Sequence, residues 1–291
     1  MRRIFCFTLA MLCYSITATA SVNVDLSSQK ITLGEPIKVT IVTKAPIKKY
    51  KIALNKKKFK LFLEERKKNK YTYSALIGIK RQAKAGSYKM AVDIVLKNKV
   101  RFYEDYKIVL AYKMPAKKGR VTLSKSKKKL SKNKSAYSTE QDLLSKKFSR
   151  ISKKNYYKSK FTYPAKGRIS SPFGRMRYYN NGNTSSHAGL DIANKKGTKV
   201  VAPQSGMVIL SETLDIHGNT VMIDHGQGLV SIFCHLNKRT IFENKRVKKG
   251  QKIGEMGNTG VASGVHLHWG MSVQNVRVDP LFFLKNRYIS K

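Results

Sequence analysis

The distribution of glycine divides this 291-residue chain into unlike parts. Residues 164–291 hold fifteen of the nineteen glycines, all six histidines and the only tryptophan. Their apolar runs are short, as at 207–210, 220–223 and 229–233, and the segments between them contain Gly, Asn or Pro. Short apolar runs between turn-forming residues are typical of β-strands joined by tight turns. We therefore predict an antiparallel β domain over 164–291 in a chain that is mostly β.

Residues 21–113 show a second β pattern, in which apolar and polar residues alternate and glycines are few. Alternation with a period of two places the apolar side chains on one face of a strand. About seven short strands in a region of this length fit an immunoglobulin-like β-sandwich. The clearest predicted strands are 37–42, 59–63, 71–77 and 88–94.

The chain is strongly basic, with 59 Lys and Arg against 16 Asp and Glu and a net charge of +43. Such a charge suits a polyanionic neighbourhood. It is spread along the chain and is densest in residues 114–163, where 125–134 are nearly all Lys, Ser and Asn and predict a solvated linker. A nucleic-acid site would concentrate the charge and interleave it with aromatic residues. The spread of the charge instead suits electrostatic association with an anionic cell wall or membrane surface, and the alternative is that it records a lysine-rich composition without a partner.

A short helix is predicted within this basic linker. Residues 138–141, Ser-Thr-Glu-Gln, resemble a capping box. Leu144, Phe148 and Ile151 follow at helical spacing. We predict a short amphipathic helix that starts near Ser138 and packs on a neighbouring domain.

The first twenty residues have the organisation of an export signal. Two arginines precede an apolar run over residues 4–16, and residues 18–20, Ala-Thr-Ala, form a small-x-small cleavage site. The run is shorter than the about 20 residues that a membrane span needs. We predict a signal peptide over 1–20, export through the Sec pathway, and a mature protein in the periplasm, cell envelope or extracellular space. This location argues against nucleic acid as a partner.

Two pairs of residues in 164–291 have the spacing of metal ligands. His187 and Asp191 lie four residues apart in a glycine-containing segment that we expect to be extended and to enter a strand. His266 and His268 are two residues apart, which places both imidazoles on one face of a strand. Catalytic zinc commonly takes three protein ligands and leaves a fourth position for water. His187, Asp191 and one histidine of the second pair would supply such a set.

Residues 164–291 resemble the M23 family of zinc metallopeptidases, the lysostaphin-like or LytM domains that cut peptidoglycan cross-links. The residues that carry this resemblance are Ser171-Pro172-Phe173-Gly174, His187-Ala188-Gly189-Leu190-Asp191-Ile192, Gly218-Asn219-Thr220-Val221, Ile223-Asp224-His225-Gly226, Cys234-His235-Leu236, Val247-Lys248-Lys249-Gly250-Gln251, Gly257-Asn258-Thr259-Gly260 and His266-Leu267-His268-Trp269. The resemblance implies that Zn2+ is bound by His187, Asp191 and His268, and that His235 and His266 are the catalytic pair. The amino-terminal region resembles, more loosely, the immunoglobulin-like domain that precedes some of these peptidases.

The chain departs from the family pattern in a few places. The family often has Tyr where this chain has Phe233, and we expect that side chain to pack. Some members use a Tyr upstream of the first zinc ligand to support the oxyanion, and Tyr178 and Tyr179 are both candidates. His217 and His225 fall outside the ligand pattern, and we expect them at a groove edge and in an ordered turn, respectively.

The resemblance implies a zinc-dependent endopeptidase that hydrolyses the peptide cross-links of bacterial peptidoglycan. His235 or His266 would accept the proton of the attacking water, and the other would stabilise the oxyanion or protonate the leaving amine. The runner-up function is a non-catalytic LytM-type activator of cell-wall amidases, because some relatives lack the zinc ligands. All of those ligands are present here.

Several properties stay open at the level of sequence. The cross-link could join D-Ala to diaminopimelate, which is the default, or be a glycine bridge. The sandwich and linker could occlude the groove. The spacing of the candidate residues does not decide which bond is cut or whether the groove is occluded. It also leaves open the oligomeric state and whether the enzyme acts on its own wall or on another cell.

Overall fold

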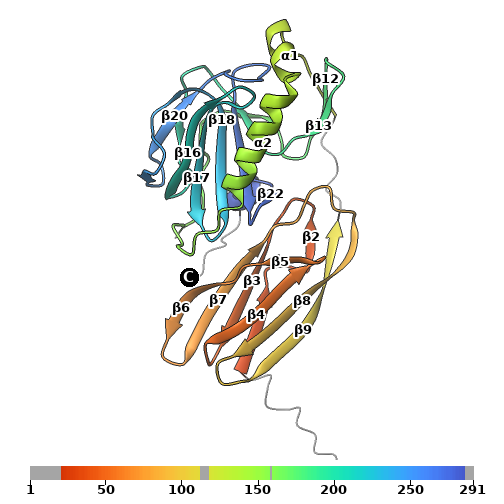
Figure 1. Cartoon of the computed structure of the whole chain (residues 1–291), viewed down its shortest axis with the longest axis vertical. Coiled ribbons are helices and arrows are strands. Elements are labelled where there is room, and N and C mark those ends of the chain that lie inside the picture. The colour runs from red at the N-terminus through yellow and green to blue at the C-terminus, as the bar shows by residue number, and fades with distance from the viewer. Residues whose placement is uncertain (1–20, 112–117, 158, 286–291) are drawn as a thin grey trace, which may run out of the picture.

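A computed structural model describes residues 21–111, 118–157 and 159–285. The signal-peptide prediction for residues 1–20 lies outside them. The chain is mostly β and forms two lobes, with the strands up to β9 in one and the strands from β11 onward in the other (Figure 1). Among the described residues no helix is long and apolar enough to cross a membrane.

The first lobe consists of two facing sheets whose alternating residues share one core. One sheet has the strand order β1-β3-β7-β6 and the other β2-β9-β8-β4-β5. The pattern of β3 shows why the lobe folds this way, because its buried and half-buried residues alternate along the whole strand. The strands are β1 (Val22–Leu26), β2 (Lys30–Thr32), β3 (Ile37–Thr43), β4 (Ile47–Leu54), β5 (Lys57–Phe59), β6 (Phe62–Lys67), β7 (Lys70–Ile77), β8 (Gly86–Leu96) and β9 (Arg101–Ala111).

Two details of this lobe differ from the sequence prediction. The predicted strand 59–63 is divided at Lys60 and Leu61 between β5 and β6, which belong to different sheets. This division adds one strand, and the described part of the lobe has nine strands where about seven were expected. The two-sheet arrangement agrees with a β-sandwich, and its immunoglobulin-like character stays a prediction.

The second lobe is built on one large antiparallel sheet. Its main strand order is β11-β14-β21-β18-β17-β16-β19, and the apolar runs predicted as strands at 207–210, 220–223 and 229–233 lie within β16, β17 and β18. A small sheet, β10-β12-β13, lies beside it. The elements are β10 (Gly119–Val121), β11 (Arg168–Ser171), β12 (Met176–Tyr179), β13 (Thr184–Ser186), β14 (Leu190–Ala193), β15 (Lys199–Val201), β16 (Gly206–Leu214), β17 (Gly218–Gly226), β18 (Leu229–Arg239), β19 (Arg246–Val247), β20 (Lys252–Met256), β21 (Leu267–Val273), β22 (Val276–Val278) and α3 (Leu281–Lys285).

The basic linker contains two helices, α1 (Lys125–Ser131) and α2 (Lys134–Phe148), where the sequence predicted one. Helix α2 starts after Asn133, whose side chain accepts a hydrogen bond from the Ala136 N–H. The predicted start at Ser138 is therefore wrong by one helical turn, because a competing cap lies upstream. Residues 125–134 include no buried residue, in agreement with the predicted solvated segment, but most of them are helical, which the sequence did not predict.

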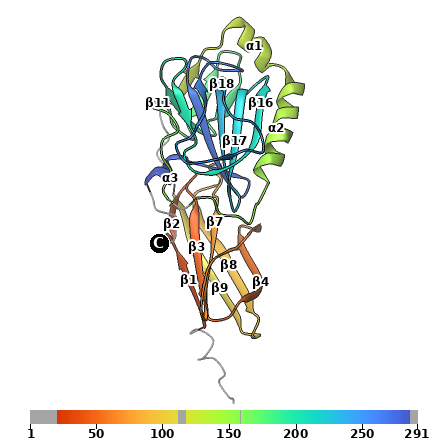
Figure 2. The same cartoon turned by 90° about the vertical axis from the view of Figure 1, so that its left-hand side faces the viewer.

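The prediction that the linker helix packs on a domain is confirmed. Leu144 and Phe148 are buried in a cluster with Ile209, Leu210 and Met222 on one face of the large sheet. Figures 1 and 2 show α2 lying along this face. Ile151 falls after the helix end and is exposed, so it is not part of the packed stripe.

The two lobes are joined by hydrogen bonds over a long sequence separation. The side chain of Gln274 accepts from the Lys60 N–H at 2.7 Å and donates to the carbonyls of Lys60 and Leu76. The guanidinium of Arg81, in the loop between β7 and β8, donates to the Ser186 hydroxyl at 2.7 Å. This second contact places the sandwich beside the segment that leads to His187.

Candidate metal centre

Two neighbouring strands position the three predicted ligands. Asp191 on β14 lies directly opposite His268 on β21 in the antiparallel register. His187 is four residues before Asp191, in the segment that enters β14. Gly189 lies between them, and a Cβ atom there would lie 2.7 Å from the His268 imidazole. A side chain at this position would therefore displace a ligand, which explains the glycine.

The ligand atoms of these residues form a small triangle. The distance from His187 Nε2 to His268 Nδ1 is 3.0 Å, and Asp191 Oδ1 lies 2.9 Å from each of these nitrogens. The ligands of a tetrahedral zinc, with bonds of about 2.0–2.2 Å, are separated by about 3.3 Å. The triangle is therefore a slightly contracted face of such a tetrahedron, and the donor set of two imidazoles and one carboxylate fits zinc.

Hydrogen bonds outside the triangle fix which ring nitrogen of His187 faces inward. His187 Nδ1 lies 2.9 Å from the Pro172 carbonyl oxygen, which can only accept. The proton is therefore assigned to Nδ1, and the lone pair of Nε2 points to the other two ligands. A preset ring orientation of this kind is common among metal-binding histidines.

The protonation states at neutral pH also suit a cation. Burial lowers the pKa of His268 to about 3, so its ring is neutral. Burial alone would raise the pKa of Asp191, but the adjacent imidazoles of His187 and His268 hold that pKa well below the ordinary value. The centre thus presents a carboxylate and unprotonated nitrogen in a site where all three residues are at least largely buried.

Arg177 on β12 is a fourth polar neighbour of the centre. Its guanidinium donates to Asp191 Oδ2 and, at 3.1 Å, to the Ser171 hydroxyl. The Arg177 side chain is only 17% exposed. It therefore balances the charge of Asp191 on the side away from the two imidazoles, a role that the sequence did not indicate.

The predicted catalytic pair, His235 and His266, lies beside the triangle. The two ring centroids are 5.0 Å apart, and that of His235 is 6.2 Å from that of His268. Each ring is held by a backbone carbonyl at 2.9 Å from Nδ1, which is that of Thr259 for His235 and that of Gly264 for His266. With the proton assigned to Nδ1, both Nε2 atoms are hydrogen-bond acceptors.

A β-bulge directs His235 into the site. The register between β17 and β18 shifts between Phe233 and Leu236, and His235 has a positive φ of 62°. Such a bulge re-aims a side chain, and strained backbone of this kind is concentrated at functional sites. Burial, followed by the nearby imidazoles of His266 and His268, lowers the pKa of His235 well below its ordinary value. The ring is therefore a neutral base.

The centre lies in a groove formed by two cavities of about 630 and 290 Å³. His187 and His268 line the first, Asp191 and His266 line the second, and His235 lines both. A chain-like substrate could therefore pass the centre on both sides. The cavities also share Tyr179, whereas Tyr178 lines neither, so only Tyr179 of the two candidate tyrosines lies in the groove.

The linker forms part of this groove. Strand β10 pairs in parallel with β12, and Leu123 exchanges two hydrogen bonds with the Asn180 side chain. On the opposite side, the Lys127 ammonium of α1 donates to the carbonyls of Asn258 and Gly260. Residues 119–131 therefore bridge two walls of the groove.

The remaining two histidines do not join the metal centre. His225 is fully buried, and its ring nitrogens lie 2.8 Å from the Ser205 carbonyl and 2.7 Å from the Ser231 hydroxyl. Burial lowers its pKa to about 4. His217 lines the larger cavity, in agreement with its predicted place at a groove edge.

His217 has a partner that the sequence did not indicate, Glu140 on α2. The Glu140 carboxylate lies 2.5 Å from His217 Nδ1 and accepts from the N–H groups of Ile216 and His217. The carbonyl of His217 in turn accepts from the His235 N–H at 3.0 Å. The linker helix is therefore connected through one loop to the backbone of a predicted catalytic residue.

We expect Glu140→Gln to lower the free energy of unfolding by about 1–3 kcal/mol at pH 7, because a buried, hydrogen-bonded carboxylate is lost. Burial opposes ionisation of Glu140, yet the hydrogen bonds from His217 and Ile216 lower its pKa overall. Its stabilisation is therefore complete above about pH 4.3, the ordinary glutamate pKa, and is lost as the pH falls below that value. Urea unfolding at pH 7 and pH 4 measures both effects.

The matched control for this experiment is Asp142→Asn, which removes an exposed carboxylate from the same helix. We expect it to change stability by less than about 0.5 kcal/mol. Equal effects of the two substitutions at pH 7 would contradict the anchoring role of Glu140.

Comparisons with known proteins cover the region of the chain that contains this site. Residues 185–280 match the model of Peptidase family M23. The chain is 32% identical over 123 residues to the peptidoglycan DD-endopeptidase ShyA of Vibrio cholerae, covering 42% of this chain and 29% of that protein. It is 31% identical over 130 residues to the murein hydrolase activator NlpD of Escherichia coli, covering 44% and 32%. The chain thus spans about three tenths of the length of these relatives.

A solved structure extends the similarity beyond the matched domain. A crystal structure assigned to peptidase M23 from Pseudomonas aeruginosa shares 26% sequence identity, with a TM-score of 0.60. The alignment covers 84% of this chain and 92% of that one. The family match, this architecture and the cluster of His187, Asp191 and His268 identify a peptidase family M23 domain in this chain.

Proposed function

We propose that this chain is a zinc-dependent endopeptidase that hydrolyses the peptide cross-links of bacterial peptidoglycan. The observation that carries the proposal is the convergence of five side chains in one groove. Three of them, His187, Asp191 and His268, form a ligand triangle, and His235 and His266 lie beside it. The match to a peptidase family and the likeness to a named peptidoglycan endopeptidase support it.

His187 Nε2, Asp191 Oδ1 and His268 Nδ1 would hold the zinc. Zinc bound there would polarise the scissile carbonyl and lower the pKa of a bound water toward about 7. Arg177 would keep the Asp191 carboxylate ionised and oriented.

His235 and His266 would carry out the proton transfers. Each has an Nε2 acceptor while its Nδ1 is held by a carbonyl, so each can accept a proton from water without turning. Once protonated, the same nitrogen can donate to the leaving amine or to the developing oxyanion. The two rings are close enough for one to act as the base and the other as the donor.

The experiment that tests this function uses the mature chain, residues 21–291, and purified peptidoglycan sacculi. We expect released muropeptides whose masses correspond to cleaved cross-links, loss of this release with a chelator, and its return with added zinc. Mass spectrometry of the products identifies the bond. Intact cross-links after prolonged digestion by zinc-loaded protein would overturn the proposal.

The second candidate is a non-catalytic activator of cell-wall amidases, which the likeness to the activator NlpD favours. The two functions differ in what they require. An activator would raise the activity of an added amidase without cleaving cross-links, and replacement of His266 would leave that effect intact. The test adds purified amidase to the digestion described above and compares reactions with and without the His266→Ala variant. This comparison distinguishes the two functions.

We further propose that the chain acts outside the cytoplasm, which residues 1–20 and the peptidoglycan substrate support. The net charge of +43 would aid retention on an anionic wall or membrane surface. Cell fractionation of a tagged full-length chain tests this, and recovery in the cytoplasm with residues 1–20 still attached would contradict it.

A further inference from the structure

Arg277 lies in the larger cavity of the groove without an Asp or Glu partner among the described residues. Arg277 on β22 lines the larger cavity together with His187, His235 and His268. No Asp or Glu lines this cavity in the part of the chain that the structure describes. The Arg277 Nη1 atom is buried and lacks a hydrogen-bond partner among the described residues. A cation with an unused donor in a groove is suited to bind an anion.

The position of Arg277 follows from the register of the sheet. Arg277 lies opposite Ser272, so its side chain is on the face of the sheet that also carries Gly270 and His268. Gly270 has no side chain, and a Cβ atom there would lie 3.0 Å from Arg277 Nη1. The missing side chain therefore makes room for the guanidinium. Gly270 and the ligand His268 are two residues apart on one strand, which is about 7 Å.

The neighbours of the guanidinium hold it in place but leave its charge unbalanced. Its central carbon lies 3.7 Å from the centroid of the Phe148 ring on α2, a stacked arrangement. Stacking occupies the face of the guanidinium and leaves the in-plane N–H groups for an acceptor. Burial lowers the pKa of Arg277 to about 10, so the group is still a cation at neutral pH.

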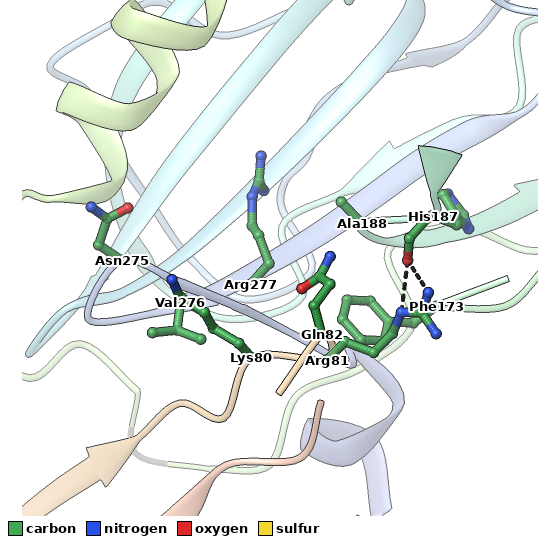
Figure 3. A pocket seen from close by; sticks show the side chains of 10 residues that line it. Lys80, Arg81, Gln82, Phe173, His187, Ala188, Asn275, Val276 and Arg277 are labelled. Carbon is green, nitrogen blue, oxygen red and sulfur yellow. Dashed lines mark hydrogen bonds between the residues drawn. The ribbon is translucent and has the colours of Figure 1, made fainter. Parts of the chain in front are cut away.

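A neighbouring cavity of about 260 Å³ between the two lobes is also lined by basic side chains, which differ from Arg277 in direction and burial. It is lined by Lys80 and Arg81 of the sandwich and by Arg277. Figure 3 shows the Arg277 guanidinium pointing away from Lys80 and Arg81. Arg81 already donates to Ser186 and Lys80 is exposed. Arg277 is therefore distinguished from the surrounding basic surface by its direction and its burial.

We propose that Arg277 is a specificity residue that binds a free carboxylate adjacent to the scissile amide of the substrate. This inference rests on the proposed endopeptidase function and narrows its substrate class. In a D-Ala to diaminopimelate cross-link, the carbon that bears the leaving nitrogen also bears a carboxylate. That carboxylate would be within reach of a cation near Gly270 when the amide lies at the metal centre. A glycine bridge has no such group, so Arg277 favours the first kind of cross-link.

The test compares two synthetic cross-linked peptides that differ only in whether this carboxylate is free or amidated. We expect the mature chain to prefer the free carboxylate in kcat/KM, and Arg277→Gln to lower kcat/KM for that peptide by about 10- to 100-fold. For the amidated peptide, the same substitution should change kcat/KM by less than about threefold. Arg277→Lys keeps the charge but not the planar fork of the guanidinium. Its kcat/KM for the free-carboxylate peptide should lie between the values for the wild type and Arg277→Gln. Lys80→Ala, which removes a nearby cation, is the matched control and should leave the preference unchanged.

Binding separates this inference from the proposed function. Calorimetry with both peptides is carried out on His266→Ala, and on the same protein with Arg277→Gln, after zinc content and melting temperature are shown to match. A preference of about tenfold or more for the free carboxylate that disappears with Arg277→Gln supports the subsite, whether or not the peptide is cleaved. Equal binding of both peptides by His266→Ala, or an equal loss of preference with Lys80→Ala, overturns it.

Discussion

We expect His235→Ala and His266→Ala, made separately in the mature chain, to lower the rate of cross-link hydrolysis by about 100- to 10,000-fold. Each substitution removes an Nε2 acceptor on a ring that lies beside the metal centre and whose Nδ1 is held by a carbonyl. Neither residue belongs to the ligand triangle, so both variants should retain one zinc per chain. Muropeptide release and zinc content by mass spectrometry measure the two effects on the same preparations.

The control for this prediction is Tyr178→Ala, which alters an exposed side chain on the same wall without changing either cavity of the groove. It should keep nearly full activity. Retained zinc with lost activity in both histidine variants would support the proton-transfer roles. Full activity of both variants would refute them, and loss of zinc would assign the residues to metal binding instead.

The candidate ligands could be narrowed from sequence to His187, Asp191 and one histidine of the pair His266 and His268, because their spacings are local, while the choice of His268 came from the family resemblance. His187 and Asp191 are four residues apart, and His266 and His268 are two apart, so each pair is confined by the geometry of a single extended segment. The structure adds the register, which places Asp191 opposite His268 and joins the two pairs. The short apolar runs likewise predicted β-strands, because their burial depends on period-two alternation within a few residues.

The groove could not be predicted because its contacts join distant residues. Glu140 is 77 residues from His217, and Lys127 is 131 residues from Asn258. The lysine-rich segment that forms α1 has only a weak local sequence pattern for a helix, and its position depends on these tertiary contacts. Arg277 was missed for the same reason, since its significance depends on Gly270 and Phe148 rather than on any motif.

Replacement of Asp191 should have the largest effect on the metal centre. We expect Asp191→Ala to lose zinc at micromolar free metal and to lower cross-link hydrolysis by more than about 1,000-fold, because one of three protein ligands is removed. Wild-type protein should gain stability with zinc as mass action requires, and the variant should not. Zinc content and melting temperatures with and without a chelator measure these outcomes, and one zinc per chain in Asp191→Ala would contradict the ligand assignment.

A loss of zinc could also follow from unfolding, so the same substitution is examined without metal. Asp191 and Arg177 are both mostly buried, and removal of the carboxylate leaves an uncompensated cation. We expect Asp191→Ala to lower the free energy of unfolding of the zinc-free protein by about 3–5 kcal/mol. The double variant Asp191→Ala, Arg177→Met should recover part of that stability but neither zinc binding nor activity. If Asp191 had only a structural role, the variant that recovers stability would also recover zinc binding. Recovered stability without zinc binding therefore distinguishes the role of Asp191 as the ion-pair partner of Arg177 from its role as a zinc ligand.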